Sequence, residues 1–108
     1  MRDLTPVLLE DGFREALEDG GILEVHCLAP VTHERGVVSG QWKFFVLHQQ
    51  DGDPYRQVLI LQRGLKHRIF TTAAGVASFA LGLGASTVCI PMVEGGIGVC
   101  KVPNSGRN

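Results

Sequence analysis

The sequence lacks the features that mark secreted, membrane-spanning and disordered proteins. Its N-terminus has no apolar run of the kind found in a signal peptide, which favours the cytoplasm. The longest uncharged stretch, residues 69–93, is interrupted by threonine, serine, proline and glycine and is a poor lipid-spanning segment. With 44% hydrophobic residues and a formal net charge of −1, the chain is too apolar and too weakly charged to stay unfolded. We therefore expect residues 1–108 to form one cytoplasmic domain without a membrane partner, and residues 103–108 to fray.

The chain has few cysteines, and their arrangement argues against a disulfide framework. Cys27, Cys89 and Cys100 are odd in number, show no C-x-x-C spacing, and lie among apolar neighbours. Free cysteine in such a setting behaves as a small hydrophobic residue. We expect three reduced thiols in the core.

Motifs for catalysis, phosphate binding and metal coordination are missing as well. The glycine-rich pieces lack the G-x-G-x-x-G pattern, and no G-x-S-x-G elbow holds a serine in place. Four residues could in principle gather around a metal: His26, Cys27, His33 and His48. Their spacings match no zinc template. We expect no metal and no cofactor, and an enzyme is the least supported of the functions considered.

Periodicity and turn residues divide the first half of the chain into one helix and three strands. Apolar residues at helical spacing predict a helix within residues 4–19, regular from about Phe13 and ended by two glycines. Residues 30–40 are expected to form a long turn or an irregular hairpin arm, and residues 50–54 a hairpin loop. Strands are expected at residues 22–29, 41–49 and 55–62. The strand at 41–49 is apolar on both faces, which predicts a central position in the sheet.

The second half combines a short strand, a helix and two further strands. Two threonines after a strand at residues 67–70 are suited to cap a helix that continues to about Leu83. Strands at residues 85–93 and 97–102 are expected to pair across a glycine turn. Short connections favour antiparallel pairing. This order predicts a two-layer α+β fold, with a mainly antiparallel sheet of four to six strands and two helices packed on one face.

Charge is divided unevenly along the chain, although the total is close to zero. Residues 1–53 hold four basic and ten acidic residues, a formal charge of −6, whereas residues 54–108 hold six basic residues and one acidic residue, a charge of +5. No acidic residue occurs between Pro54 and Val93. If the fold keeps these halves apart, the basic side is suited to bind an anion, or the two sides to bind each other head to tail.

A basic cluster in the predicted hairpin around residue 64 is the candidate site for a nucleic acid or another anion. It consists of Arg56, Arg63, Lys66, His67 and Arg68. Such a cluster attracts an anionic partner, and a hairpin can lie along a phosphate backbone. Alternatively, these basic residues belong to a solvent-exposed hairpin tip, where they prevent a strand edge from pairing with another chain. Without interleaved aromatic residues, the sequence leaves both interpretations open.

The segment around the second predicted helix resembles part of a known group of proteins. It reads H-R-I-F-T-T-A-A at residues 67–74, followed by Phe79 and Leu83-Gly84. Over about residues 42–92 this pattern is similar to that of small plasmid-borne proteins described as ParC-type partition-associated or plasmid stability accessory proteins. The resemblance implies a non-enzymatic accessory protein of a bacterial mobile element, acting near plasmid DNA or the partition machinery. It carries over no catalytic residue.

Two functions from different classes follow from these observations. The first is a binding protein of a plasmid or other mobile element that contacts DNA or a partition protein through the basic hairpin. The second is a self-associating scaffold or small-ligand-binding protein that dimerises through a sheet edge. We expect a homo-oligomer because edge strands pair readily with a second copy.

Overall fold

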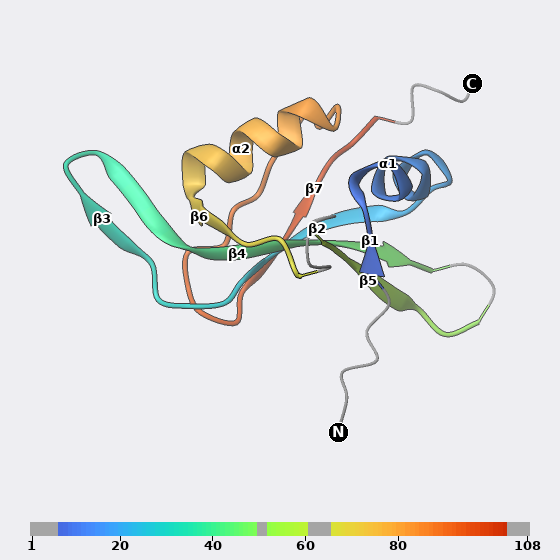
Figure 1. Cartoon of the computed structure of the whole chain (residues 1–108), viewed down its shortest axis with the longest axis horizontal. Coiled ribbons are helices and arrows are strands. Elements are labelled where there is room, and N and C mark those ends of the chain that lie inside the picture. Colours follow the sequence, from blue (N-terminus) through green and yellow to red (C-terminus); the bar gives the residue numbers. More distant parts are fainter. Residues whose placement is uncertain (1–6, 50–51, 61–65, 104–108) are drawn as a thin grey trace.

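The computed structural model describes residues 7–49, 52–60 and 66–103, which form one sheet and two helices (Figure 1). Both helices lie on the same side of the sheet, above it in Figure 1. Along the chain the elements are β1 (Val7–Leu8), α1 (Glu10–Glu18), β2 (Ile22–Cys27), β3 (Thr32–Glu34), β4 (Val37–His48), β5 (Tyr55–Leu59), β6 (Phe70–Thr72), α2 (Ala73–Gly82) and β7 (Ile97–Cys100). The predicted α+β class is therefore confirmed. Among the described residues, no helix is both long and apolar enough to cross a membrane.

Within the described residues, the sheet has seven strands, more than the four to six expected. Its main order is β1-β5-β4-β2-β7, and β3 and β6 also pair with β4. Every pair is antiparallel except β1 with β5, which is parallel. The long β4 occupies the centre, as its apolar residues on both faces predicted.

β5 and β6 follow one another along the same side of β4. Residues 55–58 pair with the C-terminal part of β4, and β6 pairs with its N-terminal part. Between these two strands, Ile60 and His67 form an isolated antiparallel bridge. This bridge, with the hydrogen bond from the Arg68 N–H to the Leu59 carbonyl at 3.0 Å, joins the described residues on the two sides of residues 61–65. The predicted hairpin tip, with Arg63, lies outside the described residues.

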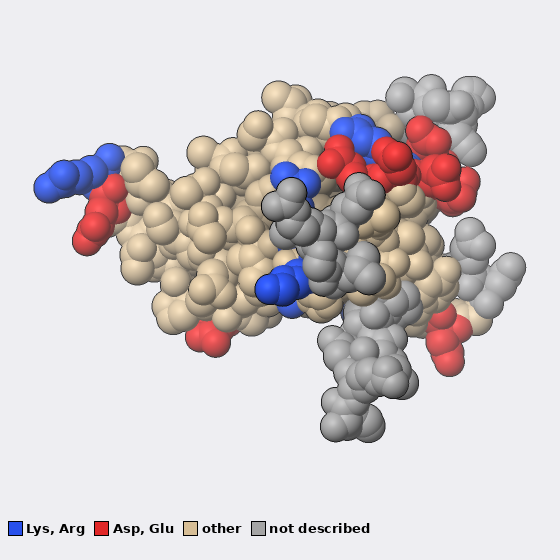
Figure 2. Space-filling view, viewed as in Figure 1, with Lys and Arg blue, Asp and Glu red and all other residues tan. Residues whose placement is uncertain are grey.

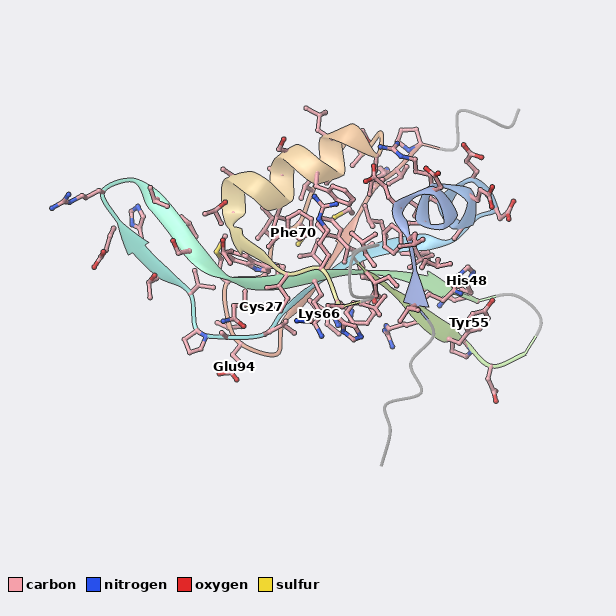
Figure 3. All side chains as sticks on the ribbon, in the orientation of Figure 1. Cys27, His48, Tyr55, Lys66, Phe70 and Glu94 are labelled. Carbon is pink, nitrogen blue, oxygen red and sulfur yellow. The ribbon has the colours of Figure 1, made fainter. Side chains whose placement is uncertain are left out.

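The core lies between the sheet and the two helices. Alternate residues of β2 and β4 point towards the helices, as the period of a strand requires. All six of these residues are buried: Leu23, Val25, Cys27, Trp42, Phe44 and Val46. The rings of Phe44, Phe70 and Phe79 pack with centroids 5.1 Å apart, and Figure 3 shows Phe70 between α2 and the sheet.

The helices begin for different local reasons. The hydroxyl of Thr72 accepts a hydrogen bond from the backbone N–H of Gly75 at 3.0 Å, so α2 has the threonine cap that the sequence predicts. α1 begins only at Glu10, with Leu9 as an N-cap that makes no side-chain hydrogen bond. The chain just before it pairs with β5 as β1, which takes these residues out of the predicted helix.

Two predicted connections have different outcomes. Residues 30–40, expected to be a long turn or an irregular hairpin arm, contain a hairpin between β3 and β4, in which Arg35 (φ 53°) and Gly36 (φ 79°) form the turn. The strand expected at 85–93 is wrong, because only Thr87 bridges to Lys101 there and β7 pairs with β2 instead. One reason is that the Pro91 carbonyl accepts a hydrogen bond from Trp42 Nε1 at 2.9 Å, which directs this segment to the core.

Candidate functional site

The face of the sheet opposite the helices carries three rows of side chains, and we call it the open face. Strand register and the alternation of side chains place neighbours on this face next to one another across β7, β2, β4 and β5. The rows are Ile97, His26 and Lys43; Val99, Glu24, Phe45 and Val58; and Ile22, Leu47 and Arg56. Charged and apolar residues therefore alternate on a surface that no described helix covers.

Glu24 is the buried centre of this face, with only 3% of the residue exposed. One carboxylate oxygen accepts hydrogen bonds from Arg56 Nε at 2.7 Å and from His26 Nε2 at 2.8 Å. The other accepts from Arg56 Nη2 at 3.3 Å. Arg56 thus binds the carboxylate with two nitrogens, the geometry that makes arginine–carboxylate pairs strong.

The ion pair shifts the titration of both partners. Burial alone raises the pKa of the Glu24 carboxyl, but hydrogen bonds from Arg56 and His26 outweigh burial and hold the pKa below its ordinary value. The hydrogen bond to Glu24 also raises the pKa of Arg56. Glu24 is therefore a carboxylate kept charged in a buried position, where its role is to orient the side chains around it.

Two rings lie beside this ion pair. The imidazole of His26 lies against the phenyl ring of Phe45, with centroids 4.0 Å apart and a 33° angle between the planes. The same imidazole donates to Glu24, so its orientation is set by a contact on each side. Phe45 itself is half-buried. Together they form a small aromatic surface next to charged groups.

A second polar contact lies at the neighbouring row. Lys43 Nζ donates to His67 Nδ1 at 2.6 Å. Because an ammonium has no acceptor, Nδ1 must be the unprotonated ring nitrogen in this contact. The preceding residue, Lys66, is exposed, and Figure 3 places it below the sheet, away from α2. The chain before β6 therefore brings Lys66 and His67 to the open face, where β4 supplies Lys43.

The structure divides the basic cluster that the sequence predicts. Arg56 and His67 contact residues of the open face, and Lys66 is exposed beside them. Arg68 lies on the helix side, with its guanidinium 4.9 Å from the Phe70 ring centroid and 3.7 Å from a carboxylate oxygen of Glu10. Arg68 therefore packs against the core and pairs with α1. Arg63 lies outside the described residues.

Acidic residues gather on the opposite side of the molecule. α1 carries Glu10, Asp11, Glu15 and Glu18 on its nine residues, with Arg14 as its one basic residue. Figure 2 shows these acidic side chains together at the upper right, over α1, while the other visible acidic groups stand singly. The fold thus keeps the main acidic surface in the helical layer and the lysines of the open face on the other side of the sheet.

Three charged or polar residues of the open face were not among the predicted site residues: Glu24, His26 and Lys43. His26 was considered only as a metal ligand, and no group of three or more His, Cys, Asp or Glu side chains among the described residues is suited to hold a metal ion. The available clue was the alternation I-L-E-V-H-C, which places Glu24 and His26 on one face of an otherwise apolar strand. The pairing with Arg56 depends on β4 lying between the two strands, which no local pattern specifies.

Comparison with known proteins adds no family to these observations. No protein family matches the chain. No curated protein matches it either. Among solved structures, none is significantly similar.

Proposed function

We propose that the open face binds the phosphates of a nucleic acid, and that the protein is a non-enzymatic DNA-binding accessory protein of a plasmid or another mobile element. The observation that carries this proposal is the charge of the open face. Lys43, Arg56 and Lys66 supply three cations there, whereas Glu24 is the only acidic residue in its three described rows and is already paired with Arg56. Cations on one surface are the electrostatic footprint of phosphate binding.

Arg56 is suited to this role despite its ion pair. Glu24 engages its Nε and one N–H of Nη2, which leaves other N–H donors of the guanidinium free to bind phosphate. Its side chain is 43% exposed, so a ligand can reach it. The Glu24 carboxylate reduces the rotational freedom of Arg56, and this lowers the entropy lost when phosphate binds.

The rings of His26 and Phe45 support a nucleic acid over a simple anion. His26 shares a row with Lys43, and Phe45 lies in the middle row, between those of Lys43 and Arg56. Bases stack on such rings at sheet surfaces that bind single strands. The resemblance to plasmid partition-associated proteins makes plasmid DNA the first probe to use. In this proposal the site differs from the predicted hairpin, because Lys43 contributes and Arg68 does not.

Fluorescence anisotropy with labelled plasmid DNA, single-stranded and duplex, at a series of salt concentrations tests the proposal. The double variant Lys43→Gln/Lys66→Gln should bind more weakly and lower the magnitude of the slope of log K against log salt by up to about 2, since each lost phosphate contact removes about 0.9. Glutamine at position 43 keeps a donor for His67.

Arg35→Asn is the matched control. It also removes a cation, but at the β3–β4 turn, and asparagine tolerates the positive φ of that position. Its binding and slope should equal those of the wild type. An unchanged slope in the lysine variant, or an equal loss in the control, contradicts binding at the open face.

Self-association is the second candidate, and the exposed side chains of β7 favour it. β7 is the last strand in the sheet order, and its Ile97 and Val99 are 51% and 56% exposed on the open face. Exposed apolar residues at a sheet edge are a common basis for dimers. Light scattering after size exclusion should give a dimer that Ile97→Thr/Val99→Thr reduces to a monomer. A wild-type monomer at high concentration rules this candidate out.

A further inference from the structure

Two cysteines from separate segments, Cys89 and Cys100, lie near each other on the helix side of β7. Gly98 and Cys100 pair with Val25 and Leu23 of β2, whose side chains belong to the core, so both face the helices. A Cβ atom at Gly98 would lie 3.0 Å from Cys89 Sγ and against the Cys89 carbonyl. Cys89 therefore lies over Gly98, in the space that a side chain would occupy. Cys100 is two residues further along β7 and faces the same side.

A bridge between their two segments holds the cysteines in this arrangement. Thr87 and Lys101 form an isolated antiparallel bridge, two residues before Cys89 and one residue after Cys100. Nearby, the backbone N–H of Lys101 donates to Thr87 at 2.9 Å, and the N–H of Ser86 donates to Lys101 at 2.8 Å. The segment before Cys89 is thus fixed to the end of β7. A disulfide needs Cα atoms about 4.4–6.8 Å apart, and residues next to an antiparallel bridge on two adjacent segments are close enough to be candidates for such a bond.

The two thiols differ in exposure, contrary to the prediction that all three cysteines lie in the core. Cys89 is exposed, whereas Cys100 is buried. Burial raises the pKa of the Cys100 thiol, so its thiolate is disfavoured. An exposed thiol beside a buried one is the arrangement in which one cysteine meets an oxidant and the other resolves the product.

We propose that Cys89 and Cys100 form an oxidation site, at which hydrogen peroxide produces an intramolecular disulfide. The Cys89 thiolate attacks one peroxide oxygen, the O–O bond breaks, and the displaced hydroxide takes up a proton as water. Cys89 is then a sulfenic acid. The Cys100 sulfur attacks the Cys89 sulfur, the S–O bond breaks, and the second water leaves. In total two thiols are oxidised by two electrons, and one peroxide is reduced to two waters.

Cys27 provides an internal control. It is buried on β2, and its thiol donates to the carbonyl of Ala29 at 3.2 Å. This thiol is shielded from solvent and makes its own hydrogen bond, so it should stay reduced. This inference does not depend on binding of a nucleic acid.

Peptide mapping of the folded protein tests the inference directly. The reduced protein is treated with hydrogen peroxide at low protein concentration, unfolded, alkylated and digested with trypsin. Cleavage after Arg68 and Lys101 places Cys89 and Cys100 in one peptide, while Cys27 falls in another. The peptide of residues 69–101 should lose two hydrogen masses and take up no alkylating reagent, whereas the Cys27 peptide should be fully alkylated.

Variants separate pairing from loss of folding. Cys89→Ser changes an exposed residue and should abolish the disulfide while circular dichroism stays unchanged. Cys27→Ser should keep the disulfide, and Cys100→Ser should leave Cys89 as a sulfenic acid that dimedone traps. Complete alkylation of both cysteines after peroxide treatment, a disulfide to Cys27, or pairing only between chains overturns the inference.

Discussion

Replacing Arg56 should destabilise the fold more than replacing Glu24, although both changes break the same ion pair. The two partners differ in burial: the side chain of Glu24 is 4% exposed and that of Arg56 is 43% exposed. When Glu24→Gln removes the carboxylate, the guanidinium can turn to water. When Arg56→Met removes the guanidinium, the carboxylate remains buried with His26 as its one remaining side-chain partner in this network.

The expected magnitudes follow from this asymmetry. Leaving one charge of a buried pair without its partner costs about 3–5 kcal/mol. Because His26 still donates to Glu24, Arg56→Met should lower the free energy of unfolding by about 3 kcal/mol, the lower end of that range. Glu24→Gln keeps an acceptor for Arg56 and should cost about 1 kcal/mol, the value of an ordinary hydrogen bond.

Urea unfolding followed by tryptophan fluorescence measures both values. The chain has one tryptophan, Trp42, which is fully buried in the core and reports on global unfolding. The double variant Glu24→Gln/Arg56→Met should cost about 1 kcal/mol, less than Arg56→Met alone, because it leaves no buried charge. The reasoning is refuted if the losses of unfolding free energy in the two single variants add up to the loss in the double variant. It is also refuted if Glu24→Gln is more destabilising than Arg56→Met.

The pH dependence of stability gives an independent check on Glu24. Because the folded state lowers its pKa below the ordinary value of 4.5, this carboxylate contributes stability above pH 4.5 that is lost as the pH falls through the lowered pKa. In the Arg56→Met variant, burial should instead raise the pKa of the Glu24 carboxyl. Protonation of Glu24 then removes the buried charge and recovers part of the lost stability. The difference in stability between the wild type and Arg56→Met should therefore be largest at neutral pH and narrow below pH 4.5. A difference that is constant with pH contradicts this assignment.

Three further changes in stability are expected from local contacts, each measured by the same urea unfolding. Thr72→Ala removes the cap that accepts the Gly75 N–H and should cost about 1 kcal/mol, while Thr72→Ser should restore most of it. Gly36→Ala meets no neighbouring atom but adopts φ 79°, so it should cost about 1 kcal/mol through backbone strain, and Gly36→Asn less. Gly98→Ala should cost more, about 1–3 kcal/mol, because the added methyl group meets the backbone carbonyl of Cys89; a neutral result would mean that the Cys89 segment moves freely.

The sequence was informative where neighbours along the chain decide the structure. The threonine pair, the small-residue helix and the following glycine predicted α2 because capping involves residues three or four positions apart. The central place of β4 followed from its apolar residues on both faces. The C-terminal strand was paired with the wrong partner, since β7 and β2 are separated by most of the chain.

The candidate site was only partly predictable for the same reason. Arg56, Lys66 and Arg68 are close in sequence, and their charge suggested one surface. The side of the sheet that each residue faces depends on register, and a shift by one residue reverses it. Register places Arg56 on the open face with Glu24, while Arg68 turns to Phe70 and Glu10 on the helix side.

The sequence by itself determined the class of fold, the central strand, the cap of α2 and the division into an acidic and a basic half. These properties depend on composition, on periodicity and on contacts between near neighbours. Only the tertiary structure decided that a buried carboxylate orients Arg56, that Lys43 joins Lys66 on the open face, and that Cys89 lies over β7 beside Cys100. The reason is that each of these contacts joins segments brought together by sheet register and by the packing of one layer on another, and neither is encoded in any short stretch of the chain.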